Sequence, residues 1–437
     1  MSAGLITLLM FGSITVALAT GLPIVFVLGG VAILFTYFLW GVQGLLAVSY
    51  NAFGVMDNFI LIALPLFIYM GIILQHSGIA ENLYNMMYKW IGGLRGGLAI
   101  GTVIICTVFA AMAGISAAAT VSMGVIALPS MIKYKYNARM AIGSICAGGA
   151  LGILIPPSVL MIVYGVFAVQ SIGALFAGGV LPGLILSLMF SFYIGIKSWL
   201  RPSMGPSVPE EEKATWGERL FSLRSVILPI LLIIIVLGTI FAGVATPSEA
   251  AAMGALGALF CALVTRRLTW QLFKNANYQT LRISCMIIWI IIAGQCLTSI
   301  YTASGAVEFI KGVLELLPVS RYIILIGMQL TIFVLGMLLD PGGIIMITTP
   351  VFVPVIQGLG FDPVWFGVLF MVNLEMAYLT PPFGLNLFYV KSIVPDSMSM
   401  AEIYKSVTPF VALQAMCLVL LIVFPEIVLW LPSILIK

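Results

Sequence analysis

The chain has 437 residues, of which 62% are hydrophobic and only 8% are charged. Because soluble globular domains carry roughly 25% charged residues, this composition excludes an ordinary soluble protein and predicts an integral protein of the lipid bilayer. Recurrent apolar stretches of bilayer-spanning length favour an all-α membrane fold over a β-barrel. The net charge of +4 lies almost entirely in loops, so it reflects membrane insertion and indicates no nucleic-acid partner.

Membrane spans are predicted in equal number in the two halves of the chain, five in each. The first Lys or Arg is Lys89, whereas a signal peptide has a basic start, so residues 1–20 are interpreted as a retained first span. The predicted spans cover about 3–18, 22–40, 59–76, 138–169, 172–198, 226–244, 247–265, 283–302, 363–392 and 407–431.

Two further apolar stretches, 97–133 and 321–358, are interrupted at their centres. The interruptions are Gly-Ile-Ser-Ala at 114–117 and Asp-Pro-Gly-Gly at 340–343. Two half-length helices that meet at small or proline-bearing residues predict a re-entrant hairpin, which leaves the membrane on the side where it entered.

The distribution of basic residues agrees with such hairpins. With both in place, all but three of the 19 lysines and arginines share one face, the exceptions being Lys311, Arg321 and Lys437. The positive-inside rule predicts that this face is cytoplasmic and that both termini lie outside. Because five is an odd number, the second half is predicted to enter the membrane inverted relative to the first.

The two halves also repeat in sequence, at an offset of about 225 residues. Pro156-Pro157 follows Pro129 by 27 residues, and Pro381-Pro382 follows Pro354 by the same interval. The predicted organisation is a first repeat at 1–198 (hairpin 97–133, broken helix 138–169), a cytoplasmic linker at 199–225, and a second repeat at 226–437 (hairpin 321–358, broken helix 363–392).

Amphipathic segments at 80–93 and 306–317 precede the two hairpins. They are either helices that lie in the membrane interface or ordinary connecting helices.

Ligand and ion binding is predicted at four breaks in the apolar segments. Two are the hairpin tips, and the others are the segments 148–158 and 375–384, each with a proline pair. Inverted repeats with broken helices bind ligands near the bilayer midplane, where helix N-termini face anions and freed carbonyls coordinate cations. Proline pairs free such carbonyls, for which a sodium ion is a natural partner; the alternative is a kink stabilised by packing.

Ionisable residues are rare in the apolar core. Asp340, at the second tip, either coordinates a cation or caps the returning helix, or does both. Glu375 is either a proton or cation site or a hydrogen-bond partner of freed backbone groups. Lys and Arg are absent from the core of every predicted span, so an anion would be held by helix N-termini, bound cations and the hydroxyls of Ser116, Ser158 and Thr380.

Several motifs resemble those of one known family. They are Leu-Gly-Ile-Leu-Ile-Pro-Pro-Ser at 151–158, Met-Ile-Val-Tyr-Gly at 161–165, Ser-Ile-Gly at 171–173, Thr-Pro-Ser-Glu-Ala-Ala-Ala at 246–252, the hairpin from 336 to 354, and Leu-Thr-Pro-Pro-Phe-Gly-Leu-Asn-Leu-Phe at 379–388. Together they resemble the large membrane (M) subunit of the tripartite ATP-independent periplasmic (TRAP) transporters. The resemblance covers essentially the whole chain.

The resemblance implies an elevator-type transporter of the ion transporter superfamily. The chain would be a sodium-driven importer of a small organic acid, a carboxylate or sulfonate, in the bacterial inner membrane with both termini periplasmic. It would act with a smaller four-helix membrane subunit and with a periplasmic substrate-binding protein that delivers the ligand. The chain has no room for the small subunit, which is therefore expected as a separate chain.

The resemblance also implies the residues of the sites. The first sodium site would use Gly114 and Ser116 with carbonyls near Gly152, Ile155 and Ser158, and the second would use Gly336, Asp340, Ala377, Thr380 and Phe383. The predicted substrate site comprises Ser116, Ala117, Ser158, Asp340, Pro341, Gly342, Glu375 and Pro382.

This sequence departs from the family at four positions. Ala113 and Ile115 replace serines common at the first tip, Ala377 replaces a common glycine, and Glu375 stands where relatives often have a small residue. Because the ions would be coordinated largely by carbonyls, the sodium sites are expected to survive these differences. The fewer tip hydroxyls and Glu375 argue against assuming a sialic acid or a simple dicarboxylate as the ligand.

Other classes of function fit the sequence less well. An intramembrane aspartyl protease needs two facing aspartates, whereas Asp340 is the only aspartate in the core, and the single histidine, His76, fits neither a zinc nor a serine protease. An enzyme is therefore not expected. A stand-alone sodium:anion symporter or exchanger of the same architecture, and a channel, remain as alternatives.

Overall fold

The prediction of an all-α membrane protein is confirmed. The computed structural model describes residues 2–315, 318–382, 384–394 and 398–436, and within these ranges every regular element is a helix. Nine helical segments in the described ranges are long and apolar enough to cross a bilayer. Helices satisfy their own backbone hydrogen bonds, which the hydrocarbon of a bilayer cannot do.

The helices of the first half are α1 (Ala3–Ala19), α2 (Ile24–Met56), η1 (Phe59–Ile62), α3 (Ala63–His76), α4 (Ile79–Ile91), α5 (Gly97–Ala113), α6 (Ser116–Lys133), α7 (Ala138–Ala150), η2 (Leu151–Ile153), α8 (Val159–Ala168) and α9 (Ile172–Leu200). The connecting stretch holds η3 (Pro202–Met204), η4 (Glu210–Glu212) and α10 (Trp216–Ser222).

The second half contains α11 (Arg224–Ile233), η5 (Ile234–Gly238), α12 (Thr239–Phe241), α13 (Pro247–Val264), α14 (Trp270–Ala303), α15 (Ala306–Glu315), α16 (Arg321–Gly336), α17 (Pro341–Gly358), α18 (Pro363–Ala377), α19 (Leu385–Lys391), α20 (Met400–Val423) and α21 (Glu426–Leu435). The helices α4 and α15 occupy the predicted amphipathic segments, of which residues 316–317 lie outside the described ranges, as does Lys437.

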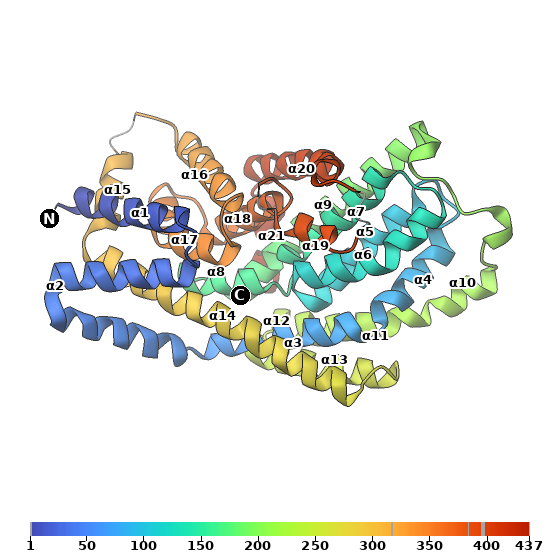
Figure 1. Cartoon of the computed structure of the whole chain (residues 1–437), viewed down its shortest axis with the longest axis horizontal. Helices are drawn as coiled ribbons and strands as arrows, with labels where there is room; N and C mark the ends of the chain where they lie inside the picture. The colour runs from blue at the N-terminus through green and yellow to red at the C-terminus, as the bar shows by residue number, and fades with distance from the viewer. Residues whose placement is uncertain (1, 316–317, 383, 395–397, 437) are drawn as a thin grey trace.

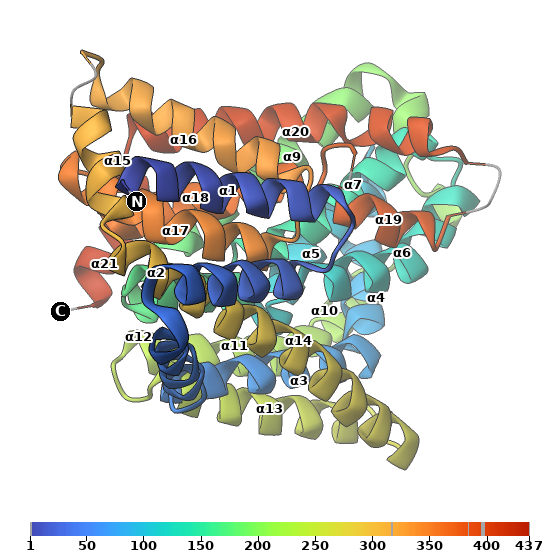
Figure 2. The same cartoon turned by 60° about the vertical axis from the view of Figure 1, so that its left-hand side comes forward.

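Contacts between the halves are reciprocal, as a pseudo-two-fold relation requires. The returning arm of the first hairpin, α6, packs on α19 of the second half, and the returning arm of the second hairpin, α17, packs on α8 of the first half. In the same way α2 packs on α14 while α3 packs on α13. In both views α3, α13 and α14 form a layer on the opposite side of the molecule from α16 and α20 (Figures 1 and 2).

Three predicted spans differ from the helices observed. The span predicted at 22–40 is the first of two helices within α2 that meet at a kink, where Gly41 has a non-helical φ of 67°, and the second of them continues to Met56. The span predicted at 283–302 begins earlier, at Trp270. The span predicted at 407–431 is two helices, because α20 ends just before Pro425, which has no N–H to continue the ladder.

The polar stretch that joins the halves is fixed to the base of the first hairpin. The amide of Gly96 donates to the carbonyl of Gly205 at 2.8 Å, and the amide of Val208 donates to the carbonyl of Gly92 at 2.9 Å. The amide of Asn137 donates to Met204 at 3.2 Å. The stretch therefore holds the segments before and after the hairpin together instead of forming a loose tether.

Glu212 is the polar centre of this attachment. Its carboxylate accepts hydrogen bonds from the hydroxyl of Tyr134, from Lys133 at 3.2 Å and from Tyr88 at 3.3 Å. The Tyr134 and Lys133 hydrogen bonds favour the charged form and hold the pKa of Glu212 below its ordinary value. The hydrogen bonds to Glu212 therefore stabilise the attachment most when the carboxylate is ionised.

Replacing Glu212 by Gln removes the charge and should loosen the stretch. We expect faster amide hydrogen exchange and faster proteolytic cleavage at 203–213 in Glu212→Gln. Since the pKa is lowered in the folded state, the stabilisation that Glu212 contributes is complete above the ordinary glutamate pKa and is lost as the pH falls through the lowered value. The matched control is Glu211→Gln, at an exposed neighbouring carboxylate; equal effects of the two changes would contradict the assignment.

Candidate functional site

The two hairpin tips and the two helix breaks surround one cavity of about 230 Å³. The first half contributes residues of the first tip and of the first break, and the second half contributes Asp340, Gly342, Tyr378 and Tyr389. The cavity therefore lies where the two repeats meet, inside the helical part of the molecule.

Three helices begin at this cavity. Ser116 is the first residue of α6, Ser158 is the N-cap of α8, and Asp340 is the N-cap of α17; all three line the cavity. The first turns of helices carry unpaired N–H groups and a partial positive charge, so helix starts favour anions. Among the described lining residues none is Lys, Arg or His.

The first tip lies directly against the first break. Gly114 has a left-handed φ of 64°, and a Cβ atom there would lie 2.2 Å from the carbonyl oxygen of Pro157. A Cβ atom on Gly152 would lie 3.0 Å from the amide nitrogen of Ser116. Only glycine permits both approaches, which bring the backbone of the predicted first sodium site together.

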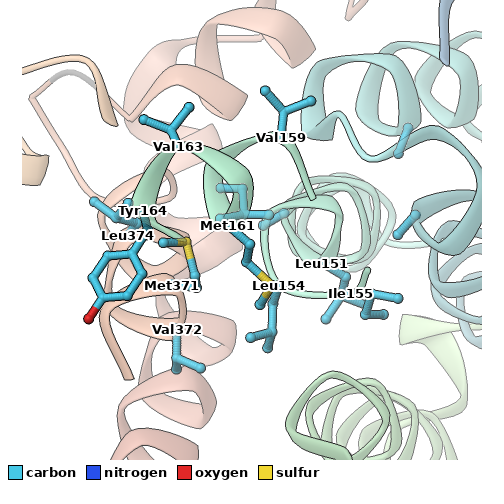
Figure 3. Packing of buried hydrophobic residues seen from close by; sticks show 14 of the residues in the cluster. Leu151, Leu154, Ile155, Val159, Met161, Val163, Tyr164, Met371, Val372 and Leu374 are labelled. Atoms are coloured by element: carbon cyan, nitrogen blue, oxygen red, sulfur yellow. The ribbon is translucent and has the colours of Figure 1, made fainter. Parts of the chain in front are cut away.

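The side chains of this set are not all directed to the cavity. The hydroxyl of Ser158 donates to the carbonyl of Ile153 and accepts from the amide of Met161 at 3.4 Å. Ile155 is buried and packs against Gly183 of α9, so only its backbone could belong to an ion site. On α8, Val159 and Val163 lie on the opposite side from Tyr164, which points toward Met371 and Leu374 of α18 (Figure 3).

The second tip approaches the second break in a matching way. A Cβ atom on Gly336 would lie 2.4 Å from the Cβ atom of Ala377. The hydroxyl of Thr380 donates to the carbonyl of Met376 at 2.8 Å, and the carboxylate of Asp340 accepts from the amide of Gly342 at 3.0 Å. Asp340 is thus a helix cap as well as a cavity residue. Phe383, the remaining predicted ligand, lies outside the described residues.

Most of the predicted substrate residues lie together. Ser116, Ala117, Ser158, Asp340 and Gly342 all line the cavity.

The other three predicted substrate residues, Pro341, Pro382 and Glu375, are not among the lining residues. Glu375 is fully buried in α18, and among the described residues neither of its carboxylate oxygens has a hydrogen-bond partner. The structure therefore separates Glu375 from the cavity, although Tyr378, one turn later, lines it.

Sequence reasoning did not assign a role to Asn386, which joins the two halves. Its carbonyl oxygen accepts from the hydroxyl of Ser116 at 2.9 Å, and its amide donates to the carbonyl of Cys146 at 3.3 Å. Asn386 is fully buried, so these bonds replace water for a polar side chain in an apolar helix. The sequence signal for this role was a polar asparagine within the apolar run that follows Pro381-Pro382.

The sequence also did not indicate that Tyr389 and one face of α14 border the cavity. Tyr389 lines the cavity, whereas its repeat partner Tyr164 is buried and donates to the carbonyl of Pro363 at 2.9 Å. The face of α14 contributes Ile283, Met286, Ile287 and Ile290. Their i, i+3, i+4, i+7 spacing shows that they share one face of a helix, but not that this face borders a cavity.

Removing the Asn386 side chain should break the two hydrogen bonds by which it links the halves. We expect Asn386→Leu to lower the free energy of unfolding by about 1–3 kcal/mol, because the Ser116 hydroxyl and the Cys146 carbonyl lose a buried partner. Thermal unfolding in detergent measures the loss, and Asn277→Leu, at an exposed asparagine on α14, is the control. If the losses of Asn386→Leu and Ser116→Ala add fully in the double variant, the two side chains are not coupled.

Comparison of the chain with known proteins identifies a matching family. Residues 11–427 match the family described as "Tripartite ATP-independent periplasmic transporter, DctM component". The chain is 31% identical to the C4-dicarboxylate TRAP transporter large permease protein DctM of Vibrio cholerae, with 100% of this chain and 98% of the relative covered.

The chain is also similar to a second relative in sequence and to a solved structure in fold. The chain is 33% identical to the ectoine TRAP transporter large permease protein TeaC of Halomonas elongata, with 85% of this chain and 86% of the relative covered. Its fold is similar to the crystal structure of the YdaH transporter of Alcanivorax borkumensis, with a TM-score of 0.66 at 12% identity over 89% of this chain and 91% of that one. Because these relatives are named as transporters or permeases, they support the expectation that the chain is not an enzyme.

Proposed function

This chain belongs to the DctM family of TRAP transporter large permeases, and on that basis we propose that it imports a small organic anion, a carboxylate or sulfonate, together with sodium ions. The family makes it a multi-pass membrane protein of a bacterial TRAP transporter, which implies the inner membrane. The positive-inside pattern supports termini on the periplasmic side.

One observation carries the proposal: three helix starts and one aspartate share a cavity without Lys, Arg or His among its described residues. The helix starts attract an anion, but Asp340 opposes it. A cation bound near Asp340 offsets this repulsion, so anion and cation each raise the affinity for the other.

Sodium is proposed as that cation because the residues around both tips supply oxygen atoms. The close approach of Gly114 to Pro157 brings a backbone carbonyl beside Ser158 in one half, and in the other half the hydroxyl of Thr380 lies 2.8 Å from the carbonyl oxygen of Met376. Gly114, Ser116, Gly152, Ile155 and Ser158 are proposed for the first ion and Gly336, Asp340, Ala377, Thr380 and Phe383 for the second. The ions are co-transported cargo, bound and released with the substrate.

An elevator movement is proposed from the grouping of the helices. The helices α2, α3, α13 and α14 pack against one another and form one group, or layer. The hairpins and broken helices, which contain the tips and breaks, form the other. The cavity has lining residues from both groups, including Ile68 of α3 and four residues of α14. A rigid movement of the hairpin group against that layer would carry the cavity across the bilayer.

We further propose that the chain works with a separate small membrane subunit and a periplasmic binding protein, as the tripartite family name indicates. Reconstitution into liposomes tests this. Sodium-gradient-driven accumulation is expected only when the small subunit and the loaded binding protein are present. Uptake of free substrate by the chain alone would show a stand-alone symporter, and flux without accumulation against a gradient would show a channel.

Asp340→Asn tests the role of the carboxylate. The variant keeps an N-cap side chain but loses the charge, so we expect sodium-dependent uptake to fall by at least about tenfold with membrane insertion unchanged. Asp362→Asn is the matched control, since Asp362 caps α18 by accepting from Val364 and Trp365 but does not line the cavity. Undiminished uptake by Asp340→Asn would show that Asp340 acts only as a cap.

A further inference from the structure

The cavity has an apolar wall that the family assignment does not explain. Ile283, Met286, Ile287 and Ile290 form one face of α14 along the cavity, and Ile68 of α3 and Met346 of α17 are also among its lining residues. The groups that attract an anion belong to other helices, at the starts of α6, α8 and α17. The cavity therefore combines an anion-binding part with a hydrocarbon part.

We infer that α14 determines specificity and selects a monoanion whose body is apolar, with no hydroxyls or second acid group beyond the anionic end. This inference rests on the proposed function and narrows its substrate class. An organic acid of this kind places its charge at the helix starts and its carbon skeleton against the isoleucines of α14.

Polyhydroxylated acids fit this cavity poorly because its serine hydroxyl protons already have acceptors within the protein. Ser116 donates to Asn386 at 2.9 Å, and Ser158 donates to the carbonyl of Ile153. Apart from the hydroxyls of Tyr378 and Tyr389, which also line the cavity, hydroxyls along the body of a substrate would face the isoleucine and methionine side chains of the apolar wall. A polar group buried there without a partner is disfavoured.

Dicarboxylates are disfavoured by charge. A second carboxylate would lie either against the apolar face of α14 or near Asp340, the one charged side chain among the described lining residues. In the first position it is desolvated without a partner, and in the second it competes with the first acid group for the proposed cation that offsets the charge of Asp340.

Binding of three acids of equal carbon number tests the inference. The purified full-length chain is heated in detergent with sodium present and increasing 4-methylpentanoate, adipate or gluconate, and the shift of Tm gives the apparent affinity. We expect 4-methylpentanoate to bind at least about tenfold more tightly than the other two, the scale at which apolar pockets discriminate. A preference for adipate or gluconate would overturn the inference and leave the proposed function standing.

Variants of α14 locate the selectivity. Ile283→Ser with Ile287→Ser should reduce the preference for 4-methylpentanoate by about tenfold or more, and Ile287→Val should retain it. Leu281→Ser is the control, because Leu281 lies on the same helix, is 62% exposed and does not line the cavity. If the double serine variant remains folded with unchanged preference, α14 does not determine specificity. If none of the acids shifts the Tm of the unaltered chain in sodium, the proposed function itself fails.

Discussion

The structure depends on how a chain in a bilayer satisfies backbone groups where its helices are interrupted. Hydrocarbon offers no hydrogen-bond partner, so irregular backbone must be enclosed by protein or line a cavity. Here each hairpin tip or arm lies against a break of the same half, Gly114 on Pro157 and Gly336 on Ala377. Each returning arm packs on the broken helix of the other half, α6 on α19 and α17 on α8. The interruptions are thus gathered at one place.

The same arrangement gives that place its electrostatic character. Helices that start inside the protein place their N-termini, which carry a partial positive charge, at the cavity, and the turns that precede them leave carbonyl oxygens nearby. Asp340 contributes to this electrostatic character in two ways, since it caps the start of α17 and also lines the cavity. Helix N-termini favour an anion and Asp340 favours a cation, and on this basis coupled transport is proposed. Asn386 connects the halves at this point through its bond with Ser116.

The two halves share a plan but differ in detail, and the differences fall on the site. Tyr164 is used for packing against α18, whereas Tyr389 lines the cavity. In the first half the chain is interrupted between α2 and η1 at Asp57-Asn58, whereas α14 continues without interruption over 34 residues. That long helix borders the cavity with one apolar face. Symmetry accounts for a cavity between the two repeats, and the residues that differ between the halves give this cavity its particular lining.

The sequence by itself determined the class of the protein, the hairpins and the positions of the breaks, because composition, glycine and proline act locally on the chain. Gly114, the proline pairs and Asp340 all stand where the chain is interrupted. It also grouped Ser116, Ser158 and Asp340 correctly around one cavity.

Only the tertiary structure decided which helix faces border that cavity. It placed Glu375 inside the packing of α18, brought Asn386 to Ser116, and turned the isoleucines of α14 toward the cavity. Those relations depend on the packing of helices far apart in sequence, and in a protein apolar on nearly every helix face, periodicity does not distinguish a lipid-facing side from a cavity wall.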